Sequence, residues 1–137
     1  MNMIYISHPY TGSERDNRKA VAAIAAELAR KYPHILFVNP LDAMRHLKAA
    51  KIPYDTVLEQ CKTLLGKCDG VIMAGNWKDS NGCMEEYLYA VNHRLTIWEG
   101  TEEFDSEEVM PHDRCGTHAG VRLVLVLEGL VHVAPRP

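Results

Sequence analysis

The sequence predicts a single α/β domain with a doubly wound, mainly parallel sheet of five strands and helices on both faces, of the Rossmann or flavodoxin-like kind. Short runs of branched apolar residues alternate with longer helical segments along the chain, which is typical of repeated β-α units. Polar loops follow the first three apolar runs, as expected where parallel strands end at a binding crevice. The 137 residues suffice for one core, and no repeat or linker divides them, so residues 1–137 are treated as one domain.

The first β-α unit is expected to consist of a strand at 4–6, a turn cluster at 7–13 and an alanine-rich helix at 14–31. One face of this helix should pack on the sheet, because suitable residues recur every three or four positions. They are Asn17, Ala20, Ile24 and Leu28.

The second unit should begin with a strand at 35–38, which Asn39-Pro40 stops. A short helix is expected at 41–50. Pro53 can open a further helix at 54–65, because proline is favoured at the first position of a helix.

A third strand is expected at 70–74, followed by a helix that begins near Ser80, and then by a fourth strand at 95–98. The acidic run at 102–108 is interpreted as a solvated face or loop. A fifth strand is expected at 121–127, where branched apolar residues are dense.

Composition excludes several classes of function. The formal charge of −3, with acidic and basic residues interspersed, argues against a nucleic acid polymer as partner. No apolar run approaches the roughly 20 residues of a membrane span, and the first residues lack a basic segment before an apolar one, so we expect a cytoplasmic protein with no membrane partner. The four cysteines form no CxxC pair and are expected to be reduced, and the segment 112–118 matches no zinc-binding spacing.

The most informative stretch is 76–86, which follows the buried-looking strand at 70–74 and opens a helix. It brings Ser80, Gly82 and Glu86 to the carboxyl edge of the sheet. A helix start there offers free backbone N–H groups to an anion, and a carboxylate one turn further in would sit beside it. This arrangement suits chemistry on a phosphorylated sugar.

Neither GxxxxGK[ST] nor GxGxxG follows the first strand, which argues against nucleotide hydrolysis and dinucleotide redox chemistry. Three polar loops remain, at 7–12, 39–40 and 75–82, and the strand ends that carry them should converge on one crevice. The candidate substrate-binding residues lie in these loops and at the helix start that follows: Ser7, His8, Tyr10, Gly12, Asn39, Trp77, Ser80 and Gly82.

Helical geometry does not choose between Glu85 and Glu86. The apolar stripe of their helix is centred about 130° from both, at roughly 100° per residue, so one glutamate faces each flank. Both could simply be solvated carboxylates near a helix start, where negative charge is favoured.

Several motifs taken together carry a resemblance to a known family. They are Ile4-Tyr5-Ile6-Ser7-His8-Pro9-Tyr10-Thr11-Gly12, Asn17-Arg18, Val38-Asn39-Pro40, Cys68-Asp69 and Trp77-x-x-Ser80-x-Gly82-Cys83-x-x-Glu86. In this order and at these strand ends they resemble the nucleoside 2-deoxyribosyltransferase-like superfamily, in particular an uncharacterised branch found in bacteria and phages. The resemblance covers about residues 3–99 and leaves 101–137 without explanation.

The resemblance implies a retaining displacement in which Glu86, four residues after the motif glycine, attacks the anomeric carbon. It implies that Tyr5 orients this carboxylate and that Ser80 contacts the phosphate of a nucleoside 5′-monophosphate. It further implies that no metal or organic cofactor is needed, and that a homo-oligomer, a dimer or larger, completes the pocket.

Some roles stay open at this stage. Trp77 or Tyr10 could stack on the base or simply pack in their loops. His8 could be a phosphate ligand, a general acid or a residue that fills space. Cys61 occupies the position at which the related enzymes carry an aspartate beside the departing base. A thiol replaces that acid poorly, so Asp42, Asp79 or another group would have to supply it.

The leading hypothesis is an enzyme that cleaves or exchanges the N-glycosidic bond of a (deoxy)nucleoside or its 5′-monophosphate. A non-catalytic module that binds or sequesters a nucleotide signal is the alternative. An NAD-type glycohydrolase is a further one, because a glutamate nucleophile also serves that reaction.

Overall fold

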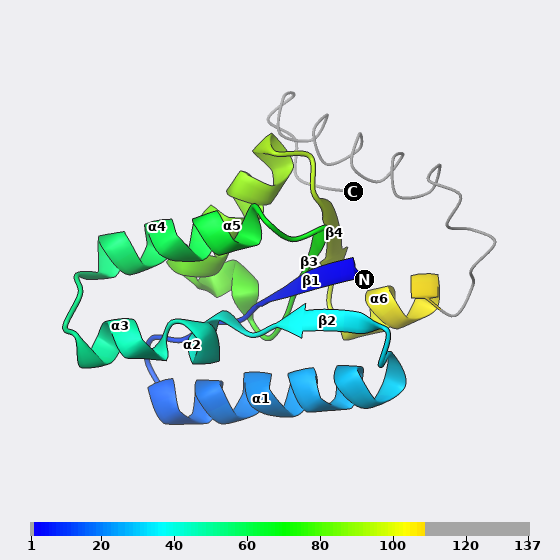
Figure 1. Ribbon diagram of the computed structural model, residues 1–137, viewed down its shortest axis with the longest axis horizontal. Coiled ribbons are helices and arrows are strands. Elements are labelled where there is room, and N and C mark those ends of the chain that lie inside the picture. Colours follow the sequence, from blue (N-terminus) through cyan, green and yellow to red (C-terminus); the bar gives the residue numbers. More distant parts are fainter. Residues whose placement is uncertain (1, 109–137) are drawn as a thin grey trace.

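A computed structural model of the chain describes residues 2–108 (Figure 1). Its sheet has four parallel strands in the order β2-β1-β3-β4. They are β1 (Asn2–Ser7), β2 (Ile35–Val38), β3 (Gly70–Met73) and β4 (Thr96–Glu99). The α/β class with a parallel sheet is confirmed, but the described part has four strands rather than five, and the strand expected at 121–127 lies outside the described residues.

Helices α1 (Glu14–Lys31) and α6 (Thr101–Glu108) contribute to the core on one face of the sheet. Val21 and Leu28 of α1 are buried there together with Phe104 of α6. The expected stripe of α1 was wrong at one position, since Ala20 is exposed and Val21 is fully buried. Spacing alone permits either residue, because both lie three or four positions from their neighbours in the stripe.

Helices α4 (Tyr54–Leu65) and α5 (Asn81–Asn92) cover the opposite face. Leu65 and Tyr87 form a second core cluster there with Tyr5 and Met73 of the sheet. A parallel sheet covered on both faces has strands that are apolar throughout, and all four residues of β3 are buried.

Several element bounds agree with the sequence-based expectation, among them the helices at 14–31 and 54–65 and the strand at 35–38. The helix expected at 41–50 is instead two helices, α2 (Pro40–Ala43) and α3 (Arg45–Ala49). The chain leaves helical geometry between them at Met44, which has φ −103° and ψ 11°.

The acidic run after β4 is a helix, α6, rather than a loop. Phe104 explains this outcome, because its ring is fully buried and meets the rings of Trp98 and Phe37 edge-on. Acidic residues of α6 add to this anchor: Asp105 accepts a 2.6 Å hydrogen bond from the Tyr32 hydroxyl, and Glu107 accepts one from Nε1 of Trp98.

The path of the chain creates a crevice at the carboxyl ends of β1 and β3. From β1 the chain crosses to β2 on one side and then returns to β3 on the other. Ser7, the last residue of β1, lies opposite Met73, the last residue of β3. Ligands of open α/β sheets bind at such a point, where the strand order reverses. None of the helices among residues 2–108 is long and apolar enough to cross a membrane.

Candidate functional site

Helix α5 directs Glu86 inward and Glu85 outward. Ser80 caps the helix, and its Oγ accepts a hydrogen bond of 3.2 Å from the backbone N–H of Cys83. Glu85 is exposed, with an Oε1 atom 3.3 Å from Nζ of Lys62. Glu86 is only 6 % exposed. The two flanks of α5, which helical geometry leaves equivalent, therefore differ completely in the folded chain.

Two hydroxyl groups of β1 hold the Glu86 carboxylate. Tyr5 donates its phenolic hydrogen to Oε2, and Ser7 donates a 2.7 Å hydrogen bond to Oε1. Tyr5 and Ser7 are two positions apart in a strand, so both side chains point to the same face of the sheet. Sequence analysis assigned Ser7 to the substrate, whereas the structure places it on the carboxylate.

Burial has the largest effect on the pKa of the Glu86 carboxyl group. It raises the pKa of Glu86 above its ordinary value, while the hydrogen bonds from Tyr5 and Ser7, and to a smaller extent the charge of Lys62, act in the opposite direction. Burial, and then the negative charge of Glu86, raises the pKa of Tyr5 well above its ordinary value. Tyr5 consequently stays protonated and available as a donor to the carboxylate.

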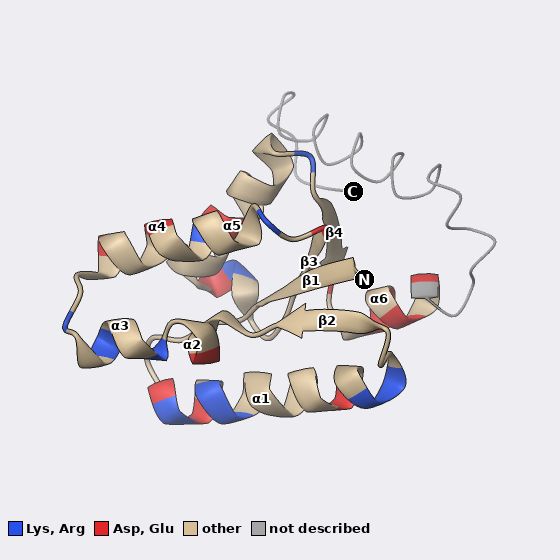
Figure 2. Cartoon of the chain, viewed as in Figure 1, with Lys and Arg blue, Asp and Glu red and all other residues tan. Residues whose placement is uncertain are grey.

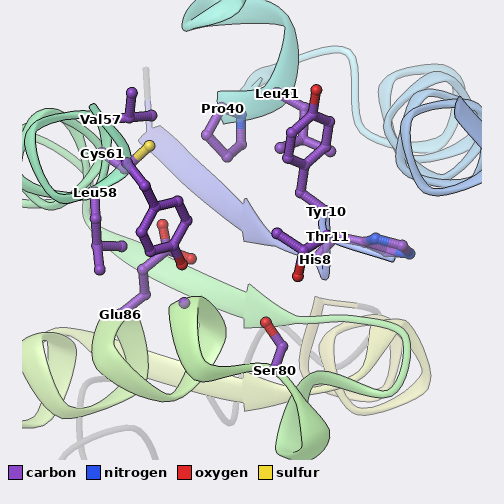
Figure 3. Close-up of a pocket in the computed structure, with 12 residues that line it drawn as sticks. His8, Tyr10, Thr11, Pro40, Leu41, Val57, Leu58, Cys61, Ser80 and Glu86 are labelled. Carbon is purple, nitrogen blue, oxygen red and sulfur yellow. The ribbon is translucent and has the colours of Figure 1, made fainter. Parts of the chain in front are cut away.

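Glu86 lies in the central pocket, an open cleft of about 80 Å³ at the crevice between β1 and β3 (Figure 3). His8, Tyr10, Ser80 and Gly82, all expected at the site, also line it. Tyr5 and Ser7 are fully buried behind Glu86. Thr11, in the loop after β1, also lines it. The other lining residues come from α2 and α4: Pro40, Leu41, Tyr54, Val57, Leu58 and Cys61.

The loop after β1 is held in a defined shape. His8 donates a 2.8 Å hydrogen bond from Nδ1 to the carbonyl oxygen of Pro9, which places the proton on Nδ1. Its ring packs against Gly75, where φ is +63° and an added Cβ would come within 2.9 Å of Nε2. Gly75 is therefore required both for its backbone conformation and for the room it leaves His8.

A polar compartment adjoins the central pocket and shares Thr11 and Ser80 with it. Gly12, which has a φ of +97°, lines it, as does Asn17. Asn17 fixes the loop by donating from Nδ2 to the carbonyl oxygen of Tyr10 over 3.1 Å. The remaining lining residues are Pro9, Ser13, Asn76 and Asp79.

An apolar compartment of about 320 Å³ also adjoins the central pocket. The two share Tyr10, Tyr54 and Cys61, among others, so they form one continuous cleft. The side chains that make the second compartment apolar come from α2 to α4: Pro40, Leu41, Met44, Ile52 and Val57. Its charged lining residues are Glu14, Arg18, Arg45 and Lys48.

Cys61 lies on the wall of the cleft beside Tyr5 and Glu86. Burial, and then the charge of Glu86, raises the pKa of its thiol to about 11. At neutral pH the side chain is therefore an uncharged thiol, which is neither a nucleophilic thiolate nor an effective proton donor.

Besides Tyr5 and Ser7, which lie behind Glu86, two expected residues do not line the three compartments. Trp77 is buried in the core and stacks on Tyr87, with the ring centroids 5.3 Å apart, in agreement with its packing alternative. Asn39 caps α2 through a 3.2 Å hydrogen bond from the N–H of Leu41. No group of metal ligands occurs among residues 2–108, and the segment 112–118 lies outside them.

Apart from Cys61, sequence reasoning missed the contribution of α4. Tyr54, Val57, Leu58 and Cys61 recur every three or four positions and share one face of that helix. That spacing could have indicated a second wall, although it does not reveal that the wall faces Glu86. The Tyr54 hydroxyl approaches so closely that a Cβ at Gly82 would lie 2.9 Å from it.

Residues 2–99 match the family described as "Domain of unknown function (DUF4406)". The chain belongs to this family. The matched span of the DUF4406 domain contains all four strands and every residue that holds Glu86. Comparison with the curated proteins and with solved structures gives no significant match.

Proposed function

We propose that this DUF4406 protein cleaves or exchanges the N-glycosidic bond of a (deoxy)nucleoside or nucleoside 5′-monophosphate, with Glu86 as the nucleophile. The observation that carries the proposal is a buried carboxylate which two neutral hydroxyl groups hold in place at the crevice of the sheet. A carboxylate with a purely structural role is more often exposed or paired with a cation. The resemblance to the nucleoside 2-deoxyribosyltransferase-like superfamily supports the same proposal.

The reaction would proceed in two displacements. A carboxylate oxygen of Glu86 forms a bond to C1′ as the bond from C1′ to the base nitrogen breaks, and the base leaves with the bonding electron pair. Water, or a second base in an exchange reaction, then attacks C1′ and releases Glu86. Both steps pass through an oxocarbenium-like transition state, so the configuration at C1′ is retained overall.

Tyr5 and Ser7 would act as positioning residues. Each bonds a different oxygen of Glu86, which fixes the rotation of the carboxylate about its last bond. A nucleophile held in attacking geometry avoids the loss of freedom that a mobile one incurs during reaction. Their hydrogen bonds also favour the ionised form, which is the form that attacks.

A second candidate, an NAD-type glycohydrolase, is favoured by Cys61. An ordinary purine or pyrimidine leaves more readily when an acid protonates it, and the neutral thiol of Cys61 supplies no such acid near neutral pH. The nicotinamide of NAD is a cationic pyridinium in the substrate and departs as a neutral molecule without a proton. A non-catalytic binding module remains the alternative from another class.

One assay distinguishes these three candidate functions. The protein is incubated with deoxynucleoside monophosphates, nucleosides and NAD in turn, and the free base is measured. We expect one substrate class to release base, and Glu86→Gln to lower the rate on the order of 10³-fold or more.

Glu85→Gln is the matched control, because Glu85 is the adjacent, exposed glutamate of the same helix turn. It should retain the rate within about twofold, as expected for an exposed side chain outside the pocket. Loss of activity in Glu85→Gln with retention in Glu86→Gln would contradict the proposal. Binding without any base release would support the non-catalytic alternative.

A further inference from the structure

Charge is divided unequally along the cleft. Asp79 is the single charged residue among those described in the polar compartment, and Glu86 is the acidic residue of the central pocket. The apolar compartment carries three basic side chains against one acidic side chain, a formal charge of +2. The protein as a whole has a formal charge of −3, so this concentration of positive charge is local.

Two of the three basic side chains of the apolar compartment, Arg18 and Lys48, converge on one point, whereas Arg45 pairs with Asp42 over 3.0 Å. Arg18 Nη2 and Lys48 Nζ lie 3.0 Å and 3.1 Å from the Tyr10 hydroxyl oxygen. The charged groups of both also lie over the Tyr10 ring, 5.6 Å from its centroid. Figure 2 shows the charged first turns of α1 beside α3, the two helices that supply these cations.

A carboxylate already stands at this point. Glu14 accepts hydrogen bonds from Tyr10, over 3.1 Å, and from Lys48. Its pKa is lowered mainly by Lys48, so it is ionised near neutral pH. The cluster of Tyr10, Glu14, Arg18 and Lys48 is thus able to hold an anion, and Glu14 is an exposed side chain that can move aside.

Arg18 has spare binding capacity. Its Nε atom is buried and has no hydrogen-bond partner among the described residues. A buried donor without a partner is unfavourable, and an anion beside the guanidinium would satisfy it. Guanidinium groups present paired N–H donors whose geometry matches carboxylate and phosphate oxygens.

We propose that the apolar compartment binds the anionic group of the ligand, a phosphate or a carboxylate, with Arg18 and Lys48 as its counter-ions. The apolar side chains beside this cluster contact the ring or sugar that carries the anion. The polar compartment, which has no Lys or Arg among its described residues, takes an uncharged part of the ligand. This differs from the sequence-based expectation, which assigned the phosphate to Ser80.

The inference rests on the proposed function only in taking a nucleoside or nucleotide as the ligand. Its test measures binding and requires no catalytic turnover. Binding is measured by calorimetry on the Glu86→Gln protein, so that no ligand is consumed. Two pairs of ligands distinguish the source of the anion: a nucleoside 5′-monophosphate against its nucleoside, and orotate against uracil. We expect the anionic member of one pair to bind about tenfold or more tightly than its neutral partner.

Arg18→Gln and Lys48→Gln, each added to Glu86→Gln, should reduce that preference to within about twofold. Lys19→Gln is the matched control, because Lys19 is an exposed neighbour of Arg18 on α1 and lines none of the compartments. It should leave the preference intact. The Lys48 side chain is 62 % exposed, so its variant tests the inference even where Arg18→Gln impairs folding.

Two results would overturn the inference. One is equal affinity for the neutral and anionic members of both pairs. The other is a preference that survives in Arg18→Gln and Lys48→Gln but disappears in Ser80→Ala, which would assign the anion to the start of α5. The proposed function fails separately, when the wild-type protein releases no base from any substrate.

Discussion

Glu86 and Glu14 stand at two neighbouring parts of the same cleft and differ in almost every physical respect. Glu86 is buried and held by neutral hydroxyl groups, and its pKa is raised. Glu14 is exposed and paired with Lys48, and its pKa is lowered. Pairing with a cation stabilises a carboxylate and makes it a weaker base, whereas burial among neutral donors leaves it reactive. This difference fits the two proposals made above, in which Glu86 carries out the reaction and the cluster around Glu14 binds the anionic group of the ligand.

Among changes that keep Glu86 in place, removing the Tyr5 hydroxyl group should have the largest effect. We expect Tyr5→Phe to lower kcat about 10²-fold, because the carboxylate loses one of the two bonds that orient it. The lost hydrogen bond also favours the ionised form, so the acid limb of the pH–rate profile should move to higher pH. Tyr10→Phe, the corresponding change beside Glu14, should act mainly on KM. Equal effects of Tyr5→Phe and Tyr10→Phe on kcat would contradict the difference in role between Glu86 and the cluster around Glu14.

Introducing a second carboxylate beside Glu86 should have the next largest effect on the rate. Cys61→Asp puts an acid close to Glu86, whose negative charge would raise the pKa of the new side chain and keep part of it protonated. A general acid for the departing base contributes about 10²-fold or more when well placed, and we expect at least about tenfold faster release of an ordinary base. The rate at which nicotinamide is released from NAD should not increase, because this group leaves without a proton. A rate gain that is the same for both leaving groups would contradict a role in protonation.

The raised pKa of Glu86 also predicts how stability depends on pH. Between the ordinary value of 4.5 and the raised value, the folded chain binds more protons than the unfolded chain, so the stability that this group contributes is lost as pH rises. Gln does not titrate. Chemical denaturation should therefore show Glu86→Gln gaining on the wild type above pH 4.5, by about 1.4 kcal/mol for each unit by which the pKa is raised. A difference that is constant from pH 4 to pH 8 would show that burial does not perturb Glu86.

The smallest effect is expected at Glu14. Glu14→Gln removes the carboxylate that competes with a ligand anion, so the affinity for that anion should rise about two- to threefold. The unfolding midpoint should barely change, because exposed ion pairs contribute little to stability. Weaker anion binding in this variant would show that Glu14 helps to build the anion site instead of occupying it.

Local sequence patterns were sufficient to predict the bounds of helices and strands whose apolar residues follow one clear periodicity. Helix α4 and strand β2 have the expected bounds, since their apolar spacing and their flanking prolines leave few alternatives. The break at Met44 and the helix around Phe104 were not predicted. Each depends on one side chain or one backbone angle in a short segment, where tertiary contacts override local preference.

Local patterns predicted which residues belong to the site but not its geometry, and the expectation that Tyr5 orients Glu86 came from the family resemblance alone. The loops that carry His8, Tyr10 and Ser80 were found because strand ends converge at a known edge of a parallel sheet. The inward orientation of Glu86 depends on Tyr5 and Ser7, which lie 81 and 79 positions away. The cluster around Glu14 was missed because Lys48 reaches it across 34 positions. Neither contact leaves a periodic signal in the sequence.

Covalent trapping would test the role of Glu86 most directly. The fluorine of a 2′-fluorinated nucleoside destabilises the oxocarbenium-like transition state. A glycosyl ester formed on the enzyme is then hydrolysed only slowly and accumulates. Peptide mass spectrometry should then show one sugar added to the peptide that contains Glu86, in the wild type and in Glu85→Gln but not in Glu86→Gln. An adduct on any other residue, or base release by Glu86→Gln at the wild-type rate, would contradict the assignment of Glu86 as the nucleophile.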